Sequence, residues 1–162
     1  QELKGSISGK TISWIGDINN MCVSWIEASN VFGFKLHVSS PPQYKHLLEE
    51  LNINQSNVEY FADPIEACVQ SSLITTDVWT SMGFEQEKQE RLKTFERWTV
   101  DKRKIDAANK DVVFMHCLPA HRGEEVSADV IDGPQSVVWQ EAENRLHFQK
   151  ALLEYLIKIN EA

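Results

Sequence analysis

Residues 111–119 read DVVFMHCLP. The apolar run up to Met115 is typical of a buried strand, and Pro119 ends it because proline cannot continue the ladder. His116 and Cys117 therefore lie at the carboxyl end of the predicted strand, which is where open α/β sheets bind ligands. A cysteine at such a place is often only a small buried residue. A functional interpretation of His116 and Cys117 is favoured because polar clusters also follow other predicted strands.

Short apolar runs alternate with helical patterns along all 162 residues. This alternation predicts one α/β domain, residues 1–162, with a three-layer, doubly wound, parallel, Rossmann-like sheet. The segment after the first strand, Gly16–Asn20, departs from G-x-G-x-x-G, so a dinucleotide fingerprint is missing. The expected strands are Thr11–Ile15, Phe34–Val38, Val58–Phe61, Leu73–Thr76, Asp111–Met115 and a weak last one at Val137–Val138. The expected helices are Asn20–Phe32, Pro41 to about Leu51, one starting at Pro64, Glu85–Trp98, Asp101–Asn109 and Glu141 to about Ile159.

The amino-acid composition limits the kinds of partner and site that the chain is expected to have. The net charge of −8 argues against nucleic acid or an anionic membrane as the main partner. Three cysteines without C-x-x-C spacing and five scattered histidines give no metal-site pattern. The small, odd number of cysteines fits a reducing compartment. The chain starts with Gln rather than Met, so we expect it to be a piece of a longer protein.

Polar residues follow the first and fourth predicted strands. Asp17, Asn19 and Asn20 either cap the next helix or form a site for a carboxylate at its amino end. Asp77 and Ser81 are a carboxylate and a hydroxyl suited to an ammonium group, although both residues are also common in solvated turns. The neighbouring Trp79 and Met82 argue against a purely solvated loop.

Two further segments are polar. Glu141–Arg145 opens the last predicted helix, where acidic residues are expected from the helix dipole and where Arg145 could pair with Glu141. The loop from Ala120 to Glu125 contains glycine and is expected to be exposed.

Taken together, the motifs resemble those of the ornithine carbamoyltransferases, and specifically their carboxyl-terminal ornithine-binding domain. The motifs are G-D-x-N-N, D-x-x-x-S-M-G, H-C-L-P and E-A-E-N-R, in this order, and they span nearly the whole chain. Ile18 stands where many relatives have glycine. The family's upstream carbamoyl-phosphate motifs are missing from these residues.

The resemblance implies roles for particular residues. Asn20, Asp77, Ser81 and Met82 would contact L-ornithine, with the last three on a mobile loop. Cys117 and Leu118 would lie beside the carbamoyl group, and Arg145 would help to hold carbamoyl phosphate. Cys117, Asp77 and His116 are the candidate catalytic residues.

The implied reaction is carbamoyl transfer from carbamoyl phosphate to L-ornithine, which gives citrulline and phosphate and needs no metal or organic cofactor. The resemblance also implies a homotrimer, a partner domain upstream that the last helix reaches, a cytoplasmic or mitochondrial-matrix location, and inactivity of residues 1–162 alone. Two alternatives remain. One is a sister enzyme that carbamoylates putrescine, N-acylornithine or aspartate, and the other is a non-catalytic amino-acid-binding module.

Overall fold

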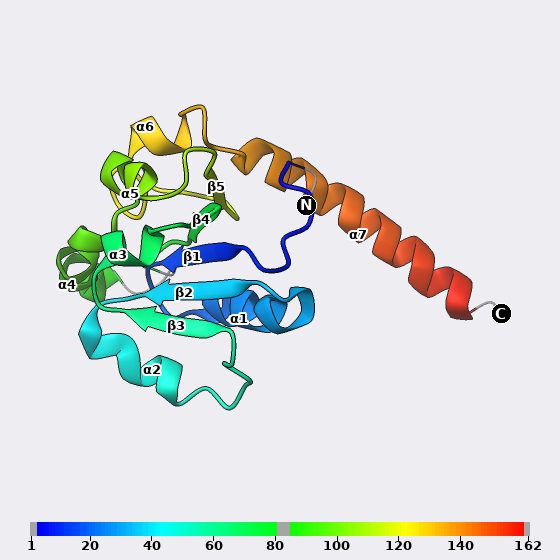
Figure 1. Cartoon of the computed structure of the whole chain (residues 1–162), viewed down its shortest axis with the longest axis horizontal. Helices are drawn as coiled ribbons and strands as arrows, with labels where there is room; N and C mark the ends of the chain where they lie inside the picture. The colour runs from blue at the N-terminus through cyan, green and yellow to red at the C-terminus, as the bar shows by residue number, and fades with distance from the viewer. Residues whose placement is uncertain (1–2, 81–84, 161–162) are drawn as a thin grey trace.

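Five parallel strands form one sheet in the order β3-β2-β1-β4-β5 (Figure 1). The computed structural model describes residues 3–80 and 85–160. The strands are β1 (Thr11–Ile15), β2 (Lys35–Ser39), β3 (Val58–Phe61), β4 (Leu73–Thr76) and β5 (Val113–His116). The order reverses between β1 and β4, so the predicted doubly wound parallel sheet is confirmed.

Helices cover both faces of this sheet. Alternate residues of β1 belong to two buried clusters: Trp14 packs with α1 residue Ile26, and Ile15 packs with α3 residue Ala67. The helices are α1 (Asn20–Phe32), α2 (Lys45–Glu49), α3 (Pro64–Cys68), α4 (Glu85–Phe95), α5 (Lys102–Ala107), α6 (Ala128–Ile131) and α7 (Val138–Asn160), with 3-10 turns η1 (Pro42–Tyr44) and η2 (Glu96–Trp98).

Local sequence signals set the helix ends. The Asn19 side chain accepts hydrogen bonds from the backbone N–H groups of Met21 and Cys22, and Asp63 caps α3 ahead of a proline in the first turn. Gly33 closes α1 in the left-handed conformation, with φ 69°. The predicted range of α1 and the predicted start of α3 at Pro64 are therefore confirmed.

The predicted weak strand at Val137–Val138 is wrong. Ser136 forms a single isolated bridge with Phe114 of β5, and the chain enters α7 at Val138. The first turn of α7 packs on the domain, because Val138 is fully buried. A helix start at this position leaves no room for a longer ladder with β5.

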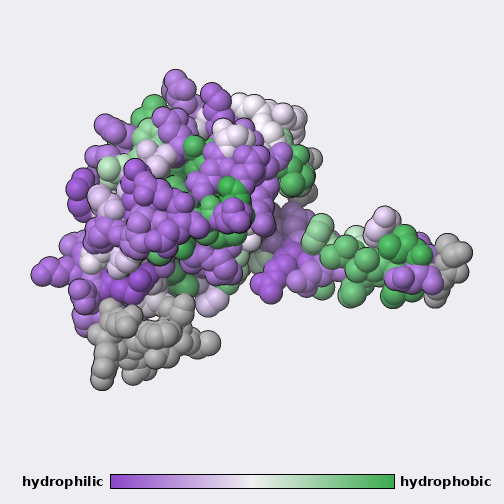
Figure 2. All heavy atoms as spheres, turned by 90° about the horizontal axis from the view of Figure 1, so that it is seen from below, coloured by the Kyte–Doolittle hydropathy of each residue, from purple (hydrophilic) through white to green (hydrophobic). Residues whose placement is uncertain are grey.

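The rest of α7 leaves the domain. Every residue from 142 to 160 is exposed, and the helix extends away from the sheet (Figure 1). Figure 2 shows an arm with hydrophobic side chains along it. The large exposed side chains of this part of α7 include Leu153, Tyr155 and Ile157. Within the described residues, no helix is long and apolar enough to cross a membrane.

Candidate functional site

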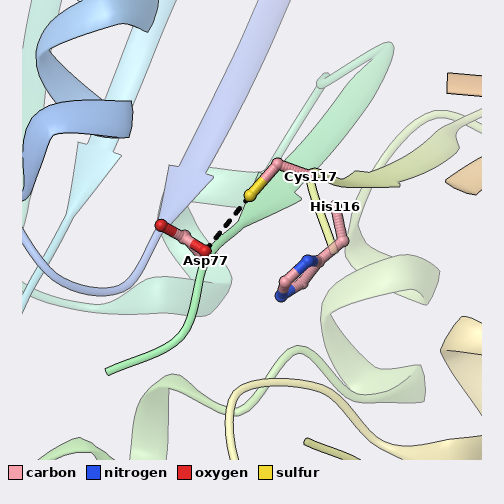
Figure 3. Close-up of side chains that lie close together, drawn as sticks. All are labelled: Asp77, His116 and Cys117. Carbon is pink, nitrogen blue, oxygen red and sulfur yellow. Dashed lines mark hydrogen bonds between the residues drawn. The ribbon is translucent and has the colours of Figure 1, made fainter. Parts of the chain in front are cut away.

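The predicted polar clusters after β1, β4 and β5 meet at one edge of the sheet. Asn19 precedes α1, Asp77 follows β4, and Cys117 follows β5 (Figure 3 shows the last two with His116). They meet because parallel neighbours end at the same edge, with Thr76 of β4 in register with His116 of β5. This is also where the strand order reverses, which is the usual ligand position in such sheets.

Asp77 connects these three segments. Its Oδ2 accepts a hydrogen bond from Nδ2 of Asn19 over 3.0 Å. Its Oδ1 accepts one from the backbone N–H of Val78 over 2.8 Å and one from the thiol of Cys117 over 3.2 Å (Figure 3). Three donors thus fix the carboxylate in place and compensate its charge.

The surroundings keep the Cys117 thiol protonated. Burial raises its pKa most, and the nearby carboxylate of Asp77, the hydrogen bond to it and the carboxylate of Glu141 raise it further, to about 12. A protonated thiol donates a hydrogen bond and is a poor nucleophile. Ligand atoms of Asp77, His116 and Cys117 lie within 4.8 Å of one another, but a metal would require the thiolate, which this environment disfavours.

His116 holds the turn that follows β5. The backbone N–H of Leu118 donates to its Nδ1 over 2.9 Å, so a neutral ring carries its proton on Nε2. That nitrogen lies 3.3 Å from Oε1 of Glu125, and both side chains are fully buried. Leu118 adopts φ 54°, a conformation that costs a non-glycine residue free energy and that the contact with His116 supports.

Glu125 is a functional candidate that the sequence analysis missed. The polar sequence of residues 120–125 predicts an exposed loop, whereas Glu125 is buried and accepts a hydrogen bond from the backbone N–H of His121 over 2.6 Å. Burial alone would raise its pKa, but the nearby imidazole of His116 and the hydrogen bond from the backbone N–H of His121 outweigh burial and hold the pKa of Glu125 below its usual range. The sequence does contain a signal for Glu125, namely an acidic residue that follows the H-C-L-P motif within a few positions.

Glu141 also contacts the site. Its Oε2 accepts a hydrogen bond from the backbone N–H of His116 over 2.9 Å, instead of serving only the helix dipole. Burial raises the pKa of Glu141 more than this bond lowers it.

A groove of about 790 Å³ lies between the start of α7 and the turn after β5. Its lining includes three predicted carbamoyl-phosphate residues, Cys117, Leu118 and Arg145. This volume is within the range of small-molecule sites, roughly 300–1,000 Å³.

The predicted ornithine residues are only partly brought together. The amide that contacts Asp77 belongs to Asn19, whereas Asn20 is exposed at the start of α1. Ser81 and Met82 lie outside the described residues.

A second contact that the sequence analysis missed joins the loops after β1 and β4. Arg91 of α4 forms an ion pair with Asp17 at 2.5 Å and donates to the backbone oxygen of Trp79 over 2.7 Å. Burial raises the pKa of Asp17 more than Arg91 lowers it. The guanidinium also lies over the ring of Phe95, 5.2 Å from its centroid.

Comparison with known proteins agrees with this site. A sequence profile described as "Aspartate/ornithine carbamoyltransferase, Asp/Orn binding domain" matches residues 8–156. The chain belongs to the aspartate/ornithine carbamoyltransferase family. It is 60% identical over 157 residues to an ornithine carbamoyltransferase of Dechloromonas aromatica, covering 96% of the chain but 51% of that protein.

Solved structures give the same assignment. The ornithine carbamoyltransferase from Burkholderia thailandensis matches with a TM-score of 0.85 at 50% identity, covering 96% of this chain and 50% of that one. The enzyme from Pyrococcus furiosus matches with a TM-score of 0.84 at 44% identity, covering 94% and 51%. The chain therefore spans about half the length of these carbamoyltransferases.

Proposed function

We propose that this chain is the ornithine-binding half of an ornithine carbamoyltransferase. The complete enzyme would transfer the carbamoyl group of carbamoyl phosphate to the side-chain amine of L-ornithine and release citrulline and phosphate, within arginine metabolism. The observation that carries the proposal is the hydrogen-bonded cluster of Asn19, Asp77 and Cys117 at the strand-order reversal, in a chain that is 60% identical to a relative named for this activity.

The acceptor would lie at this edge of the sheet. Asp77 offers a fixed carboxylate for the α-ammonium group of ornithine, helped by Ser81 and Met82, and Asn20 at the start of α1 offers an amide to its carboxylate. Specificity would then come from reading both charged groups of the amino acid. Putrescine has no carboxylate for Asn20 to contact.

The carbamoyl donor would lie in the groove lined by Cys117, Leu118 and Arg145. Arg145 offers a cation for the phosphate, and the thiol of Cys117, whose proton is donated to Asp77, offers a weakly accepting sulfur near the carbamoyl group. The catalytic contribution of these side chains is positioning and charge stabilisation.

The attacking amine must be neutral. Its free pKa should resemble that of lysine, about 10.4, so only about one molecule in a few thousand is neutral at pH 7. The apolar side chain of Leu118, which lines the groove, would favour the neutral amine by limiting its solvation.

We further propose that catalysis needs an upstream carbamoyl-phosphate domain and a homotrimer, so residues 1–162 alone are inactive. The exposed arm of α7 supports a partner domain, because no residue of the described part of the chain covers its apolar side chains. We also propose a cytoplasmic location, on the same similarity to ornithine carbamoyltransferases that supports the proposed activity.

The test is an NMR titration of the chain with L-ornithine, putrescine and L-aspartate. We expect ornithine to shift the amide signals of Asn20, Val78 and Cys117 with a Kd in the millimolar range, worth about 4 kcal/mol. Asp77→Asn should abolish these shifts, whereas Asp63→Asn, at the residue that caps α3, should preserve them. Equal shifts with putrescine, or larger shifts with aspartate, would contradict an ornithine site.

A further inference from the structure

We propose that the turn from His121 to Glu125 binds a divalent transition-metal ion such as Zn²⁺. The ligands would be Nδ1 of His121 and one carboxylate oxygen each from Glu124 and Glu125. This site is separate from the residues assigned to ornithine and carbamoyl phosphate.

The turn gathers the three side chains. The backbone N–H of Glu124 donates to the carbonyl of His121, and Gly123 donates to Val126 with φ 88°. As a result, the possible ligand atoms of His121, Glu124 and Glu125 lie within 4.8 Å of one another. Nδ1 of His121 is 3.8 Å from Oε2 of Glu125, so a small shift of the exposed imidazole would allow both to contact one ion.

An independent observation points to a ligand at this place. Glu125 is fully buried, yet its Oε2 has no hydrogen-bond donor among the described residues. Its other oxygen already accepts from the backbone N–H of His121. A buried carboxylate oxygen without a donor costs free energy, and a bound cation would remove that cost.

The ligand set selects the class of ion. One imidazole nitrogen and two carboxylates suit Zn²⁺ and its neighbours in the transition series and leave a position for water. Mg²⁺ and Ca²⁺ prefer oxygen ligands throughout. The imidazole of His121 is 46% exposed, so an ion has a route from solvent.

A bound metal ion would compete with Lys88 for the carboxylate of Glu124. Its Nζ lies 3.3 Å from Oε1 of Glu124, and the lysine side chain is 37% exposed. A pair this exposed is weak, so removing Lys88 should favour the metal by a small factor.

The experiment is calorimetric titration of the chain with Zn²⁺ in a Cys117→Ser background, which removes the rival thiol ligand. We expect one ion to bind per chain. His121→Gln and Glu124→Gln should each weaken binding about tenfold or more, and Lys88→Met should tighten it about two- to fivefold. Far-ultraviolet circular dichroism checks that each variant is folded.

The matched control is His147→Gln. His147 also lies 3.8 Å from a glutamate, Glu143, but on the exposed arm of α7 and without a buried carboxylate. The His147→Gln variant should leave the affinity for Zn²⁺ unchanged. Loss of binding in Cys117→Ser itself, normal affinity in His121→Gln, or equal losses in His121→Gln and His147→Gln would each overturn the proposal.

Co²⁺ provides a second readout. In the Cys117→Ser chain we expect visible absorption of bound Co²⁺ without thiolate charge transfer, and we expect His121→Gln to remove it. Absorption that His121→Gln leaves intact would overturn the assignment.

Discussion

The thiol of Cys117 donates a hydrogen bond to Oδ1 of Asp77 over 3.2 Å, and this contact joins the ends of β5 and β4. The same carboxylate accepts from Asn19 after β1. Three segments that are far apart in the chain thus share one anion. Burial of the thiol and the facing anion both oppose thiolate formation, which gives Cys117 the role of a donor rather than a nucleophile.

The thiol of Cys117 should therefore react slowly with iodoacetamide. With a pKa of about 12, its thiolate fraction at pH 8 is roughly a thousandfold below that of a free cysteine, whose pKa is about 8.5. The rate should keep rising between pH 9 and pH 11, and Asp77→Asn should increase it at pH 8. Peptide mass spectrometry separates Cys117 from the buried Cys22 and Cys68. Alkylation of Cys117 at the rate of a free cysteine would refute this environment.

In the proposed full-length enzyme, Cys117→Ser should lower turnover more than stability. The hydroxyl of serine keeps a donor for Asp77, so the melting temperature should change little. If the carbamoyl group lies beside Cys117 as proposed, the loss of sulfur should lower kcat about tenfold or more. A variant with unchanged kcat would limit the role of Cys117 to packing. Cys68→Ser, at a buried cysteine of α3, is the control that should leave kcat unchanged.

Arg91→Met should destabilise the chain, because it leaves the carboxylate of Asp17 largely buried without its cation. We expect a loss of about 1–3 kcal/mol in the free energy of unfolding by urea. Arg97→Met is the matched control, since its guanidinium is 72% exposed and 3.8 Å from Asp63, and it should cost under about 1 kcal/mol. Equal losses of unfolding free energy in the two variants would show that the Arg91–Asp17 ion pair stabilises the chain no more than an exposed pair does.

Truncation after Lys150 should cost little stability, because residues 151–160 are all exposed. It removes apolar side chains such as Leu153 and Ile157, so the truncated chain should self-associate less than the full one. Thermal melting and analytical ultracentrifugation measure both effects. A strictly monomeric full chain that loses several kcal/mol on truncation would place the arm of α7 on its own domain.

Local signals predicted the fold well. The period of apolar residues identified all five strands of the sheet, and Asn19, Asp63 and Gly33 marked helix ends by capping chemistry that acts within a few residues. The false strand at Val137–Val138 shows the limit of this reasoning. Two apolar residues fit a strand and a buried first helical turn equally well.

The site was harder to predict because its contacts are long-range. The sequence patterns pointed to Asp77 and Cys117, but the link of Asp77 to Asn19 depends on the register of β1, β4 and β5. The burial of Glu125 also depends on tertiary packing, since its local sequence is polar and contains glycine. The Asp17–Arg91 pair spans 74 residues and has no local signature.

The most direct test of the central claim is carbamoyl transfer by a chimaera in which the upstream half of the Dechloromonas aromatica relative precedes this chain, measured as phosphate release with every acceptor and as citrulline formation with ornithine. The assay supplies carbamoyl phosphate with ornithine, N-acetylornithine, putrescine or aspartate, and residues 1–162 alone serve as the blank. We predict ornithine-dependent citrulline production by the chimaera, none by the blank, and a raised KM for ornithine in Asp77→Asn. A folded chimaera that prefers another acceptor, or whose Asp77→Asn variant keeps a normal KM for ornithine, would contradict the account.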